Sequence, residues 1–290
     1  YMLRLITVMA ASILLSASSK ATEVMPYGTF NYKMSHDQNS SGNAYSKLEN
    51  NGSKIGVDIV DVALEGSNDL SGFANVEVGL DVDDSGSDTF DSRTAFVGIE
   101  NSGGAAISLG RQAHPYTDVH ITNSFEVYGG SAFWKYADRS SNSVKISSGP
   151  ISAMGIVDGS AGESGIDVWD VSISHTISNL GLVAGYTDDI VNDISYWAAG
   201  ASTTLGDLSL AGTYSIKDAA TDLTAYEATV GWKAATVGYG DKEGTGTYYT
   251  LGLSHGLSDS LSVYAEYQQE QLDANSNDLE HYSVGTKFSF

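Results

Sequence analysis

The stretch "FANVEVGLDV", residues 73–82, alternates between apolar and polar side chains. One set is Ala74, Val76, Val78, Leu80 and Val82, and the opposing set is Asn75, Glu77 and Asp81. Because successive side chains of a strand point to opposite faces, this pattern predicts a β-strand with one apolar and one polar face. The same period recurs in "YEATVGWK" (226–233) and "LSVYAEYQQ" (261–269), whereas helical periods are almost absent.

The composition agrees with a sheet whose surface does not all face water. Hydrophobic residues make up 41% and charged residues only 17%, against about 25% charged in an ordinary globular protein. The 32 Gly and 17 Tyr beside 3 Pro favour strands and tight turns. The chain has no Cys, which excludes disulfides, a catalytic thiol and thiolate metal sites.

Turn signals divide the chain into about sixteen strand-like runs, an even number that suits an outer-membrane barrel. The runs begin near Tyr27, Lys54, Phe73, Phe96, Ile107, Val144, Ile151, Val171, Leu182, Tyr196, Leu210, Tyr226, Val237, Tyr249, Val263 and Val284. Short and long connections alternate along the chain. This is the pattern of an antiparallel meander with short turns at one end of the strands and longer loops at the other. Several runs approach the length of a tilted strand that crosses an apolar band of about 25 Å.

These features predict an all-β, transmembrane antiparallel β-barrel, formed by residues 22–290 as a single domain. In lipid every backbone N–H and C=O must be paired internally, so a spanning sheet has to close on itself. A soluble β-sandwich or β-helix is the alternative. It would require the apolar strand faces to meet one another.

The first residues predict a secretory signal peptide over residues 1–21. Arg4 precedes the apolar run "LITVMAASILLSAS", and small residues precede a cut after Ala21. A transmembrane helix is the alternative, but the run falls short of the ~20 residues that a span needs. Removal of this segment would take away two basic residues and change the net charge from −22 to −24. Such an acidic chain is an unfavourable partner for nucleic acid.

The stretch "HYSVGTKFSF", residues 281–290, alternates large apolar with polar side chains. Tyr282, Val284, Phe288 and Phe290 fall on one face. We expect this row to be the lipid side of a closing strand, paired to the first strand near Tyr27, with its aromatic rings in an interfacial girdle.

Several phrases together resemble the general porin family of Gram-negative outer membranes, whose members are trimeric diffusion channels. They are "VMPYGTFNY" (24–32), "NNGSKIGV" (50–57), "GSNDLSGFANVEVGLD" (66–81), "TAFVGIE" (94–100), "ISLGRQAHPY" (107–116), "RSSNSVKISSGP" (139–150) and "YSVGTKFSF" (282–290). The resemblance covers residues 24–158 and the last ten residues, and elsewhere extends only to the strand-and-turn pattern. It implies a sixteen-stranded barrel whose third external loop folds inward. Residues 112–139, the longest stretch without alternation, lie where the family has that loop.

The resemblance also implies a pore constriction, in which basic wall residues oppose acidic loop residues. The matching positions are Lys54, Arg111 and Arg139 on the wall, and Asp118 and Glu126 on the loop. Glu126 is one place from the usual family position, and Thr29 stands where some members carry Lys, so the basic set is expected to be one charge weaker. Opposed charges across a narrow aqueous passage orient polar solutes.

Alternation gives a further expectation for the strand that carries Arg111. If Arg111 faces water, Ile107 and Leu109 share its side, and the small residues around Ser108 face outward. We expect that small outward face to be the subunit interface of a trimer.

Two other patterns are too weak to predict a site. Residues 81–91, "DVDDSGSDTFD", have the acid density of a calcium loop but lack the Glu at its twelfth place. The six His have no metal-ligand spacing, and no nucleophile or phosphate-loop motif occurs. The sequence therefore predicts no enzyme activity, no metal and no cofactor.

The resulting prediction is a passive outer-membrane porin for ions and small hydrophilic solutes, with a preference for cations because of the acid excess. The expected partners are outer-membrane lipid, two further copies in a homotrimer and, by resemblance, the barrel-assembly machinery that reads the C-terminal row. A substrate-selective channel is the alternative, in which aromatic loop residues form a slide, although the same residues could pin the loop to the wall. They are Tyr116, Phe125, Tyr128, Phe133 and Trp134. A barrel that serves as an enzyme or adhesin is the other alternative.

Overall fold

The computed structural model describes residues 22–39, 41–67, 69–81, 83, 89–159, 165–274 and 278–290, and nearly all of them are in strands. The strands are β1 (Glu23–Gln38), β2 (Ala44–Asn50), β3 (Lys54–Ala63), β4 (Leu70–Leu80), β5 (Phe90–Asn101), β6 (Ala106–Ala113), β7 (Arg139–Ser148), β8 (Ile151–Ile156), β9 (Val168–Ile177), β10 (Leu180–Asp189), β11 (Ile194–Leu205), β12 (Leu208–Asp218), β13 (Leu223–Trp232), β14 (Ala235–Lys242), β15 (Gly246–Gly256), β16 (Leu261–Leu272) and β17 (Asp278–Ser289). A 3-10 helix, η2 (Pro115–Val119), lies between β6 and β7. No helix of the described residues is long and apolar enough to cross a membrane. The expected signal peptide and most of the acidic segment 81–91 lie outside the described residues.

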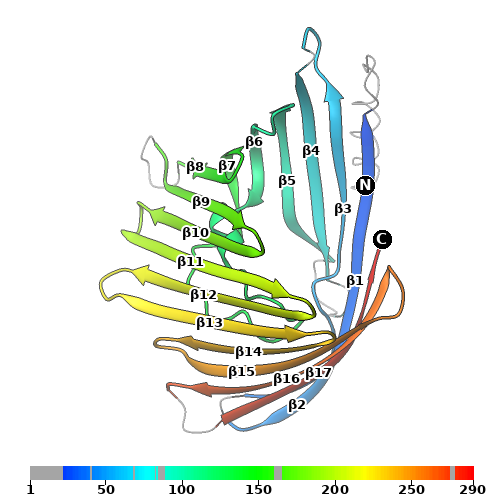
Figure 1. The fold of residues 1–290 in the computed structure, drawn as a ribbon, viewed down its shortest axis with the longest axis vertical. Coiled ribbons are helices and arrows are strands. Elements are labelled where there is room, and N and C mark those ends of the chain that lie inside the picture. Colours follow the sequence, from blue (N-terminus) through cyan, green and yellow to red (C-terminus); the bar gives the residue numbers. More distant parts are fainter. Residues whose placement is uncertain are drawn as a thin grey trace.

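The sheet closes on itself through its first and last strands, as the sequence predicts. β1 and β17 pair antiparallel, from Thr29 opposite Ser289 to Asp37 opposite His281. The backbone amides of Gly28 and Phe290 each donate to the carbonyl of the other residue, at 3.1 Å. Figure 1 shows these two strands side by side. Closure leaves no unpaired edge, which is the condition for a sheet in lipid.

The barrel has sixteen strand positions, although seventeen strand segments are described. β2 and β3 both pair with β1, and they follow each other along it with a break at residues 51–53. Each predicted run falls in its own strand, and β2 is the segment that the sequence missed. Its outer face carries Ala44, Ser46, Leu48 and Asn50, of which only Leu48 is a large apolar residue, so it has too little apolar alternation to be recognised.

The two faces of each strand reverse the usual relation between polarity and exposure. In β4, Val76 on the outer face is 43% exposed, whereas Glu77 on the inner face is 6% exposed. The inner side chains are covered by each other and by a loop inside the barrel, while the outer ones face the surroundings. An apolar exterior around a polar interior is the pattern of a transmembrane barrel.

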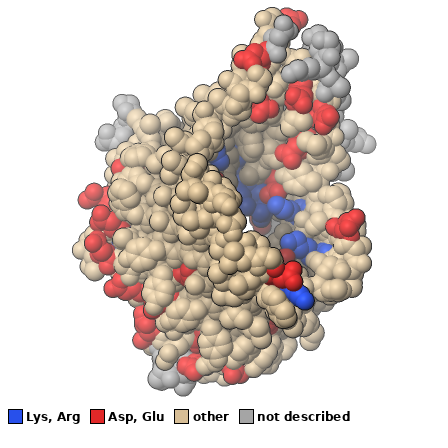
Figure 2. All heavy atoms as spheres, in the orientation of Figure 1, with Lys and Arg blue, Asp and Glu red and all other residues tan. Residues whose placement is uncertain are grey.

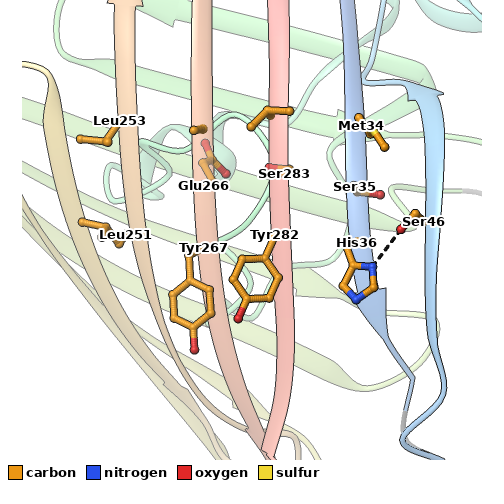
Figure 3. A pocket seen from close by; sticks show the side chains of 12 residues that line it. Met34, Ser35, His36, Ser46, Leu251, Leu253, Glu266, Tyr267, Tyr282 and Ser283 are labelled. Carbon is orange, nitrogen blue, oxygen red and sulfur yellow. Dashed lines mark hydrogen bonds between the residues drawn. The ribbon is translucent and has the colours of Figure 1, made fainter.

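Aromatic rings form a row around part of the outer face. Tyr186 contacts Trp169 and Trp197, with ring centroids 5.0 and 4.2 Å away, and Tyr267 lies 5.0 Å from Tyr282. Figure 3 shows Tyr267 and Tyr282 on neighbouring strands, while Glu266 of the same wall turns toward the loop behind it. Amphipathic rings in such a row suit the membrane interface.

The expectation for β6 is wrong. Ile107 and Leu109 lie on the outer face, and Leu109 is 53% exposed. Ser108 is 6% exposed, and its hydroxyl lies 2.6 Å from Gln112 Oε1 inside the barrel. The register against β5 runs without a shift from Ala106 to Arg111, which stands opposite Ala95, so Arg111 shares the outer side of β6 with Ile107 and Leu109. The alternation holds, and the premise that Arg111 faces the water of the interior is what fails. Residue 108 therefore does not face a neighbouring subunit.

Candidate functional site

The chain between β6 and β7, residues 114–138, folds into the barrel, two or fewer residues from the predicted limits. Its first and last parts dock through an apolar cluster on the inner wall. Tyr116 and Phe133 are buried with ring centroids 5.4 Å apart, and they pack with Val119 against Tyr196 and Ala198 of β11. This cluster fixes the base of the loop because burying these rings removes them from the water of the interior.

Phe125 packs against a further part of the wall, on β14 and β15, at two glycines. A Cβ atom on Gly238 of β14 would lie 2.6 Å from the Phe125 ring, and one on Gly252 of β15 would lie 2.9 Å from it. The ring therefore approaches the backbone at a distance that only glycine permits. Of the two functions suggested for the loop aromatics, Tyr116, Phe125 and Phe133 serve to pin the loop to the wall.

Glu227 of β13 is the first of two wall carboxylates that hold the loop. It is 2% exposed. Its Oε2 accepts a hydrogen bond from Thr122 Oγ1 at 2.7 Å and lies 2.7 Å from His120 Nε2. Its Oε1 accepts from the Gly130 amide at 2.6 Å and from the Tyr248 hydroxyl. A buried carboxylate with this many partners is satisfied, and it draws both arms of the loop to one point.

Glu266 of β16 holds the loop tip. Its carboxylate accepts hydrogen bonds from three successive backbone amides, those of Glu126 (2.6 Å), Val127 (3.0 Å) and Tyr128 (2.8 Å). The chain then turns through two glycines with positive φ, at residues 129 and 130. Consecutive amides that converge on one anion form a nest, so Glu266 binds the tip through its backbone.

Tyr128 fastens the tip to the seam of the barrel. Its hydroxyl donates to Asp37 Oδ1 at 2.8 Å, and it lies 3.1 Å from the Tyr282 carbonyl. We call the space between the tip, residues 125–130, and the inner faces of β1, β3, β4 and β17 the throat.

A buried carboxylate of the wall joins two basic residues beside the throat. Glu77 Oε2 lies 2.9 Å from Lys54 Nζ, and its Oε1 lies 2.5 Å from Arg93 Nε. Lys54 was predicted for this place, but Glu77 and Arg93 were not. Glu77 stands in the polar row of the opening stretch, which was the available signal. No sequence pattern indicated the inner position of Arg93, because the register between β4 and β5 shifts at this residue.

Arg111 and Arg139 lie on the neighbouring strands β6 and β7. The Arg111 guanidinium is 3.3 Å from the Ser92 carbonyl and 3.3 Å from Ser141 Oγ. Arg139 lies within electrostatic range of Glu77, Arg93 and Arg111. Within the described part of the chain, neither Arg111 nor Arg139 forms an ion pair. The structure thus brings Lys54 and Arg139 together with Arg93 around Glu77. Arg111 stands opposite Ala95, on the outer side of β6 with Leu109, so it is not part of the predicted constriction.

The two predicted loop acids have different surroundings. Glu126 pairs with Lys287 of β17, whose Nζ lies 2.9 and 3.1 Å from the two carboxylate oxygens. It forms no ion pair with the three predicted wall residues. Asp118 lies in η2 and is exposed to the interior. The protein around the Asp118 carboxylate desolvates it and raises its pKa above the ordinary value, an effect that Lys145 partly offsets.

Charges are distributed unevenly between the hollow and the outer surface. Figure 2 shows Lys and Arg side chains gathered in the hollow, while Asp and Glu are spread over the rims and outer edges. Field lines are focused in a water-filled cleft with protein walls, so the charges of the throat act more strongly on a passing ion than those of the rims.

Comparisons with known proteins agree with this architecture. The family model described as Gram-negative porin matches residues 6–287. A comparison with curated protein sequences gives no significant match.

Solved structures share the fold at low sequence identity. OmpT of Vibrio cholerae, folded in vitro in its trimer form, has a TM-score of 0.74 at 18% identity, covering 93% of this chain and 100% of that one. The anion-selective porin from Comamonas acidovorans gives 0.74 at 16% identity, with the same coverage. OmpF of Salmonella typhi in complex with daunomycin gives 0.72 at 15%, covering 92% of this chain and 97% of that one.

Proposed function

We propose that this chain, which belongs to the Gram-negative porin family, forms a water-filled channel for passive diffusion of ions and small hydrophilic solutes across the outer membrane. The observation that carries the proposal is the docking of an inward loop on wall glutamates inside a closed barrel. This arrangement narrows the passage and lines it with fixed charges, which are the two properties that govern solute passage through a pore.

Single-channel recording in a planar bilayer tests the proposal. Purified, folded protein should give stepwise, ohmic currents in potassium chloride without any energy source. Absence of conductance from folded protein would contradict it. Porins are in general non-enzymatic channels, and we propose that this chain also works without catalysis or cofactor.

We propose that the channel prefers cations. The support is the excess of 36 acidic over 14 basic residues, which makes the chain strongly negative as a whole. The basic side chains in the hollow act in the opposite direction. The sign of the reversal potential therefore reports which of the two contributions dominates.

We also propose a homotrimer. OmpT of Vibrio cholerae, which shares the fold, is known in a trimer form. Chemical crosslinking in native membranes should give a product of three chains. Recovery of monomers alone would contradict the proposal.

The substrate-selective alternative has no support from a particular observation. The loop aromatics named for a slide include Tyr116 and Phe133, which are buried under the loop, and Phe125, which lies against wall glycines. Residues that cover the wall in this way are not free to stack on a passing solute.

A further inference from the structure

Lys287 lies in the same C-terminal stretch as the outer-face aromatics, but it points the other way. Its neighbour Phe288 is on the outer face, 43% exposed. Lys287 stands opposite Asn31 in the seam, and its ammonium group contacts both oxygens of Glu126 at the loop tip. A residue of the closing strand therefore contributes a charge to the throat.

We propose that Lys287 is a selectivity-determining residue of the channel, as the basic partner of Glu126. This inference rests on the proposed channel function. Of the other lysines that contact the loop in the described residues, Lys242 reaches the carbonyls of Ser131 and Phe133 and the Trp134 ring. Lys217 lies over the same ring, and neither lysine forms an ion pair with a loop carboxylate among the residues that the structure describes. Lys54 and Arg93 both form ion pairs with Glu77.

Lys287 also lies near the position at which the expected set of basic residues lacks one charge. Thr29, where a lysine was missing, stands opposite Ser289, and their hydroxyl oxygens are 3.3 Å apart. Lys287 is two residues from Ser289 along β17 and so lies on the same inner face. The seam brings a positive charge from the last strand to the region where the first strand lacks one.

Glu126 is held in place independently of Lys287. Its amide donates to Glu266, and its carbonyl accepts from Asn51 Nδ2 at 2.9 Å. Because the wall fixes the backbone of Glu126 on both sides, removal of the lysine changes the charge of the throat without releasing the loop.

The pair is open to the water of the throat. The side chains of Lys287 and Glu126 are 35% and 29% exposed. Exposed ion pairs contribute little to stability because water screens them. Their charges remain within reach of permeating ions, and selectivity follows the local field.

The test compares Lys287→Met with Lys287→Arg and with Lys233→Met, a control in the turn after β13 that is 60% exposed. Reversal potentials are measured in a potassium chloride gradient. Lys287→Met should raise the cation-to-anion permeability ratio by about tenfold, because in water a unit charge roughly 6 Å from the path of an ion changes the permeability of a cation about threefold and that of an anion about threefold in the opposite sense. Lys287→Arg and Lys233→Met should leave the ratio unchanged.

A second substitution separates selectivity from assembly. Glu126→Gln should lower the ratio, and the double variant with Lys287→Met should return it toward that of the unsubstituted channel. If Lys287→Met does not assemble, the shift with Glu126→Gln and its absence with Lys287→Arg still test the pair. Unchanged ratios in these folded variants would overturn the inference. Absence of current from the unsubstituted protein would instead overturn the proposed channel.

Discussion

Single carboxylates decide where the loop lies. Glu227 and Glu266 are on the inner faces of β13 and β16, and each accepts hydrogen bonds from several loop atoms. Hydrogen bonds to a charged group contribute about 1.5–3 kcal/mol each. The geometry of the passage therefore depends on wall residues that no solute needs to touch.

Glu266→Gln should loosen the loop tip. The amide side chain keeps one acceptor oxygen for three backbone donors and loses the charge, at a cost on the order of 2–4 kcal/mol in docking. We expect greater open-channel current noise and broader conductance levels in single-channel recording.

Glu270→Gln is the matched control for Glu266→Gln. It lies on the same strand and faces His281, with Glu270 Oε2 3.8 Å from His281 Nε2. If both variants record as quietly as the unsubstituted protein, the tip is not held by Glu266.

Asp118 should make the channel sensitive to mild acid. Its raised pKa means that it binds a proton at a higher pH than an ordinary aspartate. The cost of its charged form is present above its folded-state pKa and disappears as the pH falls through that value. Lowering the pH should therefore remove a negative charge from the interior at a higher pH than an ordinary aspartate would, and shift the reversal potential toward anions.

The substitution Asp118→Asn should reduce this acid shift. Asp207→Asn, in the turn between β11 and β12 and 67% exposed, should leave it intact. Reversal potentials over a pH series from neutral to acid measure the difference. An identical pH profile for Asp118→Asn and the unsubstituted channel would refute the assignment.

At the scale of elements, β17 combines two functions on its two faces. Tyr282, Val284, Phe288 and Phe290 are all exposed on its outer face, as the alternation predicts. His281, Ser283 and Lys287 lie on the inner face. The proposed use of the outer row by the barrel-assembly machinery and the proposed use of Lys287 in the throat are thus physically separable.

Phe290→Ala should reduce assembly far more than conductance per channel. The Phe290 ring is 56% exposed on the outer face, stacks on Phe30 at 6.2 Å and lies over Gly28. Its loss removes apolar surface from the seam and leaves the throat untouched. The amount of folded protein in outer membranes should fall several-fold, while single-channel conductance stays unchanged.

Thr286→Ala, on the same outer face, serves as the control for Phe290→Ala. Normal membrane levels of Phe290→Ala would count against the assembly function.

At the scale of the whole molecule, the negative net charge favours cations, whereas the basic residues of the throat favour anions. The chain carries −22, while the hollow gathers Lys and Arg side chains. We expect the reversal potential to indicate cation preference at low salt. The preference should weaken as salt rises, because charges more than about 10 Å apart are screened at 0.1 M. A clear anion preference at all salt concentrations would contradict the prediction and assign control to the throat.

The sequence by itself determined the barrel, its strands and its seam. Period-two alternation is a local property of extended backbone, so each run could be recognised without knowledge of its neighbours. The inner placement of Glu77 in the opening stretch and the outer row at Tyr282 followed from the same rule. β2 was missed where that local signal was weak.

Only the tertiary structure decided the throat. Glu126 and Lys287 are 161 residues apart in the chain, and they meet because the barrel closes and the loop tip docks on Glu266. The side of the wall to which Arg111 belongs was decided by its pairing with Ala95 of β5, and the premise that it faces the interior was wrong. Contacts across the interior depend on closure, register and loop docking together, and no local pattern of side chains encodes these.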